Sequence, residues 1–279
     1  MSGAAARTGA TAFAAGAVAA ATLLVMTCRP AVVRADDRLL FSGNGSALSG
    51  ENGDHGGGGA LATWLRQFDS GSLFGLGAEY ETIYNSHWTL GNFNGALALG
   101  QPDRKTSLYA EAHVGSGETG PEPFDYTNVA GGITTTPLSW LTVLLEERYI
   151  DIQPSRGNLP KIGLAFHVST PLLASVSYAH SFGGNLDTRL GSARVDYAGP
   201  GFSWLLGAAY GPVAPRVLNL IGQSVGPAKT LTEGFIGGGK SFGRADWQLI
   251  GDYQDLEGFK RTTITLNCTV HLDPRSHRP

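Results

Sequence analysis

The sequence predicts an all-β fold, a transmembrane antiparallel up-and-down β-barrel of about 14 strands, with about 12 or 16 left open. Three observations lead to this prediction. Apolar and polar residues alternate along most of the chain, with the period of two that a β-strand requires. Short segments rich in Gly, Pro, Asn and Asp separate the alternating stretches. Helical periodicity is absent after residue 35, so crossover helices are not expected and neighbouring strands run antiparallel.

The clearest alternation lies in residues 261–272. One face of this predicted strand is apolar, and its residues are Ile264, Leu266, Cys268, Val270 and Leu272. The other face carries Thr, Asn and His side chains. A strand with one apolar and one polar side must place the two sides in different surroundings. The same pattern recurs upstream, so this segment predicts the form of the whole sheet.

The first 35 residues resemble a secretory signal peptide. Arg7 precedes an apolar, Ala-rich run at 11–26, and Val33-Arg34-Ala35 offers small residues for cleavage before Asp36. A retained membrane helix fits less well because the apolar run is short and rich in Ala and Gly. Lipidation at Cys28 is a third alternative, although Thr27 is a poor residue for the preceding position.

Residues 36–59 are polar and Gly-rich and predict a flexible N-terminal segment, with 39–41 as the start of a first strand. The barrel is predicted over 60–272, followed by a polar tail at 273–279. Its strands are expected at 60–68, 73–82, 88–99, 107–114, 124–135, 140–152, 161–169, 174–182, 189–197, 202–210, 233–242, 246–254 and 261–272. Strand phasing at 211–231 stays open.

Charge and cysteine content exclude two classes of protein. The full chain has a formal charge of −3, and removal of residues 1–35 takes away three arginines and no acid. An acidic mature chain argues against a nucleic-acid-binding protein, which needs a basic face. Only Cys268 would remain, so a disulfide-stabilised fold is not expected.

A soluble β-sandwich is the main alternative fold. The polar faces of the predicted strands are rich in Gly and Ser, which suits a crowded or wet barrel interior better than a surface in bulk water. Aromatic side chains, Trp88 and Trp140 among them, lie near the predicted strand ends, as in the aromatic girdles of membrane barrels. Both features favour the closed barrel.

Charged residues on the polar faces are the candidate site residues. The candidates for lining the lumen are Glu79, Glu81, Glu111, His113, Glu146, Arg148, Arg194 and Asp252. They form either a structural network, since an unpaired buried charge is costly, or a lining that selects which solutes pass. Glu147 breaks the alternation because it shares a face with Leu145, which predicts a position at headgroup level or a β-bulge.

No catalytic, metal or cofactor site is predicted. His180 and Ser181 suggest the His-x-Ser-Asn pattern of barrel phospholipases and lipid A deacylases, but adjacent residues leave opposite faces of a strand. The other histidines, His113, His167 and His271, are scattered without the spacing of metal ligands. The chain is therefore not expected to be an enzyme, and we expect no cofactor.

The chain resembles Gram-negative outer-membrane β-barrel proteins in its signal-like N-terminus, alternating strands and amphipathic last strand. It is also similar, more weakly, to YaiO-type outer-membrane barrels at 233–242 and 247–272. The resemblance implies location in the outer membrane and contact with its lipids and the barrel-assembly machinery. Whether a periplasmic partner binds is left open. A pore or export-associated channel for ions or small polar solutes such as saccharides is the first functional hypothesis. A plugged anchoring barrel and a lipid-modifying enzyme are the alternatives.

Overall fold

The computed structural model describes residues 36–50, 53–84, 86–99, 106–152, 155–214 and 228–272. Within these ranges no helix is long and apolar enough to span a membrane. The strands are β1 (Asp36–Gly50), β2 (Gly53–Gln67), β3 (Leu73–Ile83), β4 (Ser86–Leu99), β5 (Thr106–Thr119), β6 (Glu122–Leu138), β7 (Leu141–Ile152), β8 (Ser155–Asn158), β9 (Lys161–Ser169), β10 (Leu172–His180), β11 (Arg189–Ala198), β12 (Phe202–Val213), β13 (Lys229–Phe242), β14 (Ala245–Leu256) and β15 (Phe259–His271).

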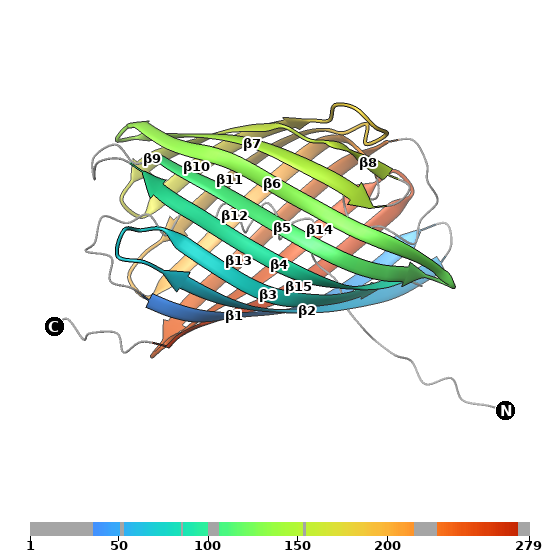
Figure 1. The fold of residues 1–279 in the computed structure, drawn as a ribbon, viewed down its shortest axis with the longest axis horizontal. Coiled ribbons are helices and arrows are strands. Elements are labelled where there is room, and N and C mark those ends of the chain that lie inside the picture. Colours follow the sequence, from blue (N-terminus) through green and yellow to red (C-terminus); the bar gives the residue numbers. More distant parts are fainter. Residues whose placement is uncertain are drawn as a thin grey trace.

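These strands form one closed antiparallel barrel (Figure 1). Apart from β8 and β9, which both pair with β7, each strand pairs with its neighbours in sequence, and β1 pairs with β15 to close the sheet. The short strand β8 pairs with one half of β7 while β9 pairs with the other half, so β8 and β9 together occupy one position in the wall. The barrel therefore has 14 strand positions, and the predicted fold class is confirmed.

β1 begins and β15 ends at the same end of the barrel, which we call the terminal end (left in Figure 1). Arg38 of β1 lies opposite His271 of β15 there. The side chain of His271 hydrogen-bonds with Asp36 through Nδ1 at 3.1 Å and with Asp246 through Nε2 at 2.7 Å. The opposite end, where β1 turns into β2 and β14 turns into β15, is called the distal end.

The outer wall is apolar. Large hydrophobic side chains are about half exposed on every part of it, as Leu76 at 50%, Trp140 at 51% and Leu206 at 53% illustrate. Alternate residues on the same strands are buried and face the interior. Since lipid offers no hydrogen-bond partners, a sheet with such an exterior has to close on itself, and this one does. Glu147 is exposed on this outer face without a bulge, in continuous register with Gly131 of β6.

Two expectations from the sequence are wrong. Residues 36–59 are not a flexible segment, because they form β1 and the first half of β2 in the wall. Their glycines suggested turns, but pairing with β15 on one side and β3 on the other holds them extended. Trp88 is not part of an outer girdle, because its side chain is fully buried and faces inward. The predicted signal peptide, Cys28 and the tail at 273–279 lie outside the described residues.

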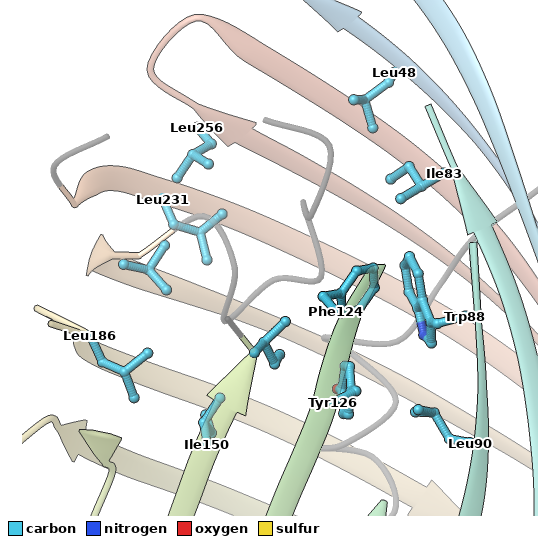
Figure 2. Packing of buried hydrophobic residues seen from close by; sticks show 12 residues of the cluster. Leu48, Ile83, Trp88, Leu90, Phe124, Tyr126, Ile150, Leu186, Leu231 and Leu256 are labelled. Atoms are coloured by element: carbon cyan, nitrogen blue, oxygen red, sulfur yellow. The ribbon is translucent and has the colours of Figure 1, made fainter. Parts of the chain in front are cut away.

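Apolar side chains fill the distal end of the barrel interior (Figure 2). We call this set the apolar layer, and it consists of Leu48, Ile83, Trp88, Leu90, Phe124, Tyr126, Ile150, Ile152, Leu186, Val213, Leu231 and Leu256. Most come from wall strands within a few residues of a distal turn, and Leu186 comes from the connection between β10 and β11. Trp88, Leu186, Val213 and Leu231 have no exposed surface. The interior of this end is therefore packed like a protein core.

A glycine makes this packing sterically feasible. A Cβ on Gly117 would lie 2.3 Å from the His87 carbonyl oxygen and 2.6 Å from Phe124 Cζ and Trp88 Cβ. We expect Gly117→Ala to lower the free energy of unfolding by about 1–3 kcal/mol, because two aromatic side chains would have to shift. The measurement is the urea midpoint in detergent micelles. Gly43→Ala is the matched control, since no atom lies within 4 Å of a Cβ there. Equal midpoints for both variants would contradict the steric argument.

Candidate functional site

Ionisable side chains line the barrel between the apolar layer and the terminal end. On β7 the inward residues run from Glu146 and Arg148 to Ile150 and Ile152, so charge gives way to apolar packing toward the distal end. The same change occurs on β3 between Glu81 and Ile83. We call the ionisable set the charged belt, and it consists of Glu79, Glu81, Glu111, His113, Glu146, Arg148, Lys161, Arg194, Asp196, Glu233, Asp252 and Arg261.

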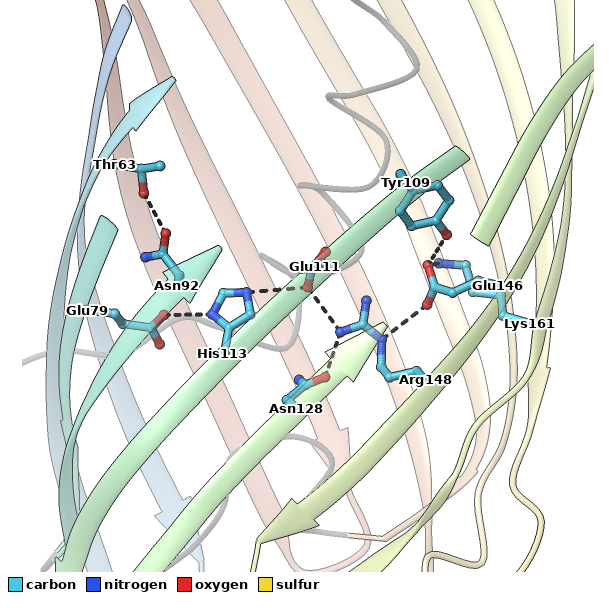
Figure 3. A network of polar contacts seen from close by, with 10 residues as sticks. All are labelled: Thr63, Glu79, Asn92, Tyr109, Glu111, His113, Asn128, Glu146, Arg148 and Lys161. Atoms are coloured by element: carbon cyan, nitrogen blue, oxygen red, sulfur yellow. Dashed lines mark hydrogen bonds and ion pairs between the residues drawn. The ribbon is translucent and has the colours of Figure 1, made fainter. Parts of the chain in front are cut away.

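Arg148 is the centre of the largest network in the belt (Figure 3). Its Nε atom donates to Glu146 Oε1 at 3.1 Å, and its Nη1 atom donates to Glu111 Oε1 at 3.1 Å. The same Nη1 donates to Asn128 Oδ1 at 2.8 Å. Arg148 is 6% exposed, so these bonds form away from bulk water, where they are stronger. One guanidinium thus joins carboxylates from β5 and β7.

Two extensions carry this network around the wall. On one side His113 contacts Glu111 at 3.3 Å and Glu79 at 3.2 Å, which links β5 to β3. On the other side Glu146 accepts a bond from the Tyr109 hydroxyl at 2.6 Å and lies 3.5 Å from Lys161 Nζ of β9. Figure 3 shows these side chains in one continuous chain across the inner face. The network therefore ties together strands from β3 to β9.

The opposite wall carries separate, smaller groups. Arg194 Nη2 lies 2.6 Å from Asp196 Oδ1 on β11. Gln254 Nε2 donates to Glu233 Oε1 at 2.9 Å. Arg261 of β15 lies close enough to Asp252, Glu81 and Glu233 for electrostatic attraction. Acidic side chains outnumber basic ones in the belt, so the belt has a formal excess of negative charge.

All eight predicted lumen residues lie in the charged belt, because the alternation of their strands was assigned correctly. Glu79, Glu81, Glu111, Glu146, Arg148, Arg194 and Asp252 are at most 7% exposed, and the His113 side chain is 13% exposed. Their role in selecting a solute stays a prediction. Sequence reasoning missed Lys161, Asp196, Glu233 and Arg261. Asp196 could have been found from the sequence, because it follows Arg194 by two residues and therefore lies on the same face of the strand.

The histidine and serine of the enzyme hypothesis are used for other contacts. Ser181 accepts a hydrogen bond from the Thr188 backbone nitrogen at 2.7 Å and donates to the Leu186 carbonyl at 3.3 Å. The ring of His180 lies against Tyr178 and Phe182. These contacts hold the β10–β11 connection and give the serine no base. In the ranges that the structure describes, no group of three His, Cys, Asp or Glu side chains is placed to hold a metal ion.

A closed barrel with an apolar exterior and a charged interior defines the class of outer-membrane β-barrel proteins. No family model and no curated protein matches the chain. Among solved structures, the CymD monoaromatic hydrocarbon channel is 11% identical with a TM-score of 0.59, over 97% of this chain and 96% of that one. The toluene transporter TodX of Pseudomonas putida is 9% identical with a TM-score of 0.53, over 95% and 94% of the two chains. The chain thus has the fold of outer-membrane channels, whereas the YaiO-type resemblance stays a prediction.

Proposed function

We propose that this protein is a gated outer-membrane channel for cations or small polar solutes such as saccharides. The charged belt is the observation that carries this proposal. A solute that crossed the barrel would pass these inward-facing side chains, and their excess of carboxylates would favour cations and neutral solutes over anions. The protein would lie in the outer membrane, depend on its lipids and on the barrel-assembly machinery, and leave its terminal end open to a periplasmic partner.

The cost of the belt supports a role beyond stability. Replacing a buried ion pair with well-packed apolar residues is often neutral or stabilising by about 1–4 kcal/mol. The distal end of this barrel is packed in that apolar way. A barrel that served only as an anchor would gain from continuing the apolar layer through its middle. Charged side chains in the middle instead suit the passage of polar solutes.

The apolar layer is the proposed gate. Apolar constrictions stop ions because water leaves them, and they conduct when side chains or loops move apart. Leu186 and Val213 belong to, or adjoin, connections at the distal end, and such connections open at lower free-energy cost than wall strands. An apolar solute of the kind named for CymD and TodX fits this layer but has no partner in the charged belt.

Conductance in a planar bilayer tests the proposal. We expect the purified protein to show brief openings with preference for K⁺ over Cl⁻. The double variant Glu79→Gln, Glu111→Gln should lower this preference about two- to fivefold, because two inner carboxylates are neutralised. Glu147→Gln, on the outer face, is the matched control and should leave the preference unchanged. The channel proposal is overturned if the inserted barrel shows no conductance at any voltage, both in the wild-type protein and in a variant with a smaller apolar layer such as Trp88→Ala.

A plugged anchoring barrel is the second candidate. The apolar layer favours it, because the layer fills the distal end without a gap around Trp88 and Leu231. The pairing of Arg148 with two carboxylates favours it too, since a structural network needs its charges compensated. This candidate predicts an inserted barrel without conductance, so the same bilayer measurement separates the two.

A further inference from the structure

Several buried polar atoms on one part of the inner wall have no hydrogen-bond partner among the described residues. They include both carboxylate oxygens of Glu81, the indole Nε1 of Trp88, Oδ2 of Asp252 and the hydroxyl of Thr263. Glu81 and Trp88 have no exposed surface, and Thr263 is 1% exposed. Buried polar groups in folded proteins are nearly always paired, so a cluster of unpaired ones needs an explanation.

These four residues form two pairs in the wall, and we call them the inner-wall site. Glu81 of β3 is directly opposite Trp88 of β4, and Asp252 of β14 is directly opposite Thr263 of β15. Arg261 precedes Thr263 by two residues on the same face of β15, and it lies near enough to Glu81 and Asp252 for electrostatic attraction. The site therefore spans the seam of the barrel, from β14 across β15, β1 and β2 to β4, at the boundary between charged belt and apolar layer.

A neighbouring amide extends the site toward the terminal end. Asn92 follows Trp88 by four residues on the same face of β4, a separation of about 13 Å along a strand. Its Oδ1 accepts a hydrogen bond from the Thr63 hydroxyl at 3.2 Å, while its Nδ2 has no partner in the described part of the chain. Unpaired polar atoms thus follow the direction in which a solute would move along the barrel.

The chemistry of the unpaired atoms selects a class of ligand. Glu81 and Asp252 offer acceptors, Trp88 and Asn92 offer donors, and Thr263 offers both. A bare cation would satisfy the carboxylates but not the N–H groups, and it would be repelled by Arg261. An anion would be repelled by the carboxylates, and a hydrocarbon would leave all these atoms unpaired. A neutral molecule with several hydroxyl groups pairs with both the acceptors and the donors of the site, because each hydroxyl group can donate and accept a hydrogen bond.

We propose that the inner-wall site binds a neutral, hydroxyl-rich solute of the polyol or saccharide class. The proposal deepens the function proposed above and rests on it. Hydroxyl groups of the solute donate to Glu81 and Asp252 and accept from the indole N–H of Trp88 and the amide of Asn92.

Fluorescence of Trp88 provides the test. The chain has five tryptophans, and Trp88 alone among them is fully buried in the barrel. In a variant with Trp64, Trp140, Trp204 and Trp247 changed to Phe, we expect maltotriose to change the emission saturably in detergent. Glu81→Gln and Asp252→Asn should each weaken the apparent affinity about tenfold or more, since each replaces a carboxyl oxygen that accepts a bond from the solute with an amide N–H₂. Glu147→Gln should leave it unchanged.

Each other outcome overturns the proposal. Saturation by KCl alone identifies a cation site, and saturation by toluene alone identifies an apolar site. No response to any of the three means that the unpaired atoms serve no ligand of these classes. If the single-tryptophan variant does not fold, calorimetric titration of the wild-type protein with maltotriose decides the question. The titration measures binding without transport, so it separates the two proposals. Conductance without binding of maltotriose refutes the inner-wall site alone. Binding without conductance refutes the channel alone.

Discussion

Replacing Arg148 with methionine is expected to lower the free energy of unfolding by about 3–5 kcal/mol. The side chain is 6% exposed and donates to Glu111, Glu146 and Asn128. Its removal leaves two carboxylates buried with fewer compensating charges, and that cost exceeds the small net value of the bonds themselves. The measurement is the urea midpoint in detergent micelles, followed by the shift of the folded band on gels.

Three further variants make this result specific. Arg148→Lys should lower the free energy of unfolding by less than Arg148→Met does, because the positive charge remains although the forked geometry of the guanidinium is lost. Arg148→Met combined with Glu111→Gln should recover part of the loss, since one uncompensated charge is removed. Arg66→Met is the matched control, because Arg66 is 44% exposed and its pair with Asp37 should contribute about 0–1 kcal/mol. Equal losses at positions 148 and 66 would show that the network does not depend on Arg148.

Replacing Trp88 with alanine is expected to raise the conductance several-fold and to lower stability by about 3–5 kcal/mol. The indole is fully buried in the apolar layer and packs against Phe124 at a ring distance of 6.4 Å. Its removal leaves a cavity in the layer that we propose as the gate, so water and ions enter more often. Single-channel recording gives the conductance, and urea unfolding gives the stability.

Trp140→Ala is the matched control for this gate. Trp140 is 51% exposed on the outer wall, where it stacks on Phe166, so its loss should leave the current unchanged. Unchanged current in Trp88→Ala, together with a clear loss of stability, would show that the apolar layer is packing and does not control passage. The plugged anchoring barrel would then be the better account of the fold.

The fold and the charged belt were accessible to sequence reasoning because both follow from a period of two. Glu79 and Glu81 share a face, as do Glu111 and His113, and a charged face of a membrane barrel has only the interior to occupy. The alternation with a period of two shows which face of the strand each residue is on, but it does not show which residues on other strands it bonds with. That Arg148 bonds with Glu111, 37 positions away, depends on the register of β5, β6 and β7.

The apolar layer could not be predicted for a related reason. Trp88 and Leu90 alternate with exposed residues, as they would on a lipid-facing strand, and an aromatic near a strand end is typical of a girdle. The polar residues that share this face, Ser86, Asn92 and Asn94, are the sequence signal that it is the inner one. The unpaired atoms of the inner-wall site lie at this boundary, which the alternation alone does not locate.

The contact between β1 and β15 has a consequence for how the barrel forms. The hydrogen bond from His271 to Asp36 joins residues 235 positions apart, and the Leu272 backbone nitrogen donates to the Asp37 carbonyl at 2.8 Å. A ring that closes over such a separation bears a large entropic cost and folds slowly. Until the last strand arrives, β1 presents an unpaired edge to any other strand nearby. The earliest part of the barrel to be synthesised is therefore among the last to be completed, and it is the part that most needs protection from misassembly.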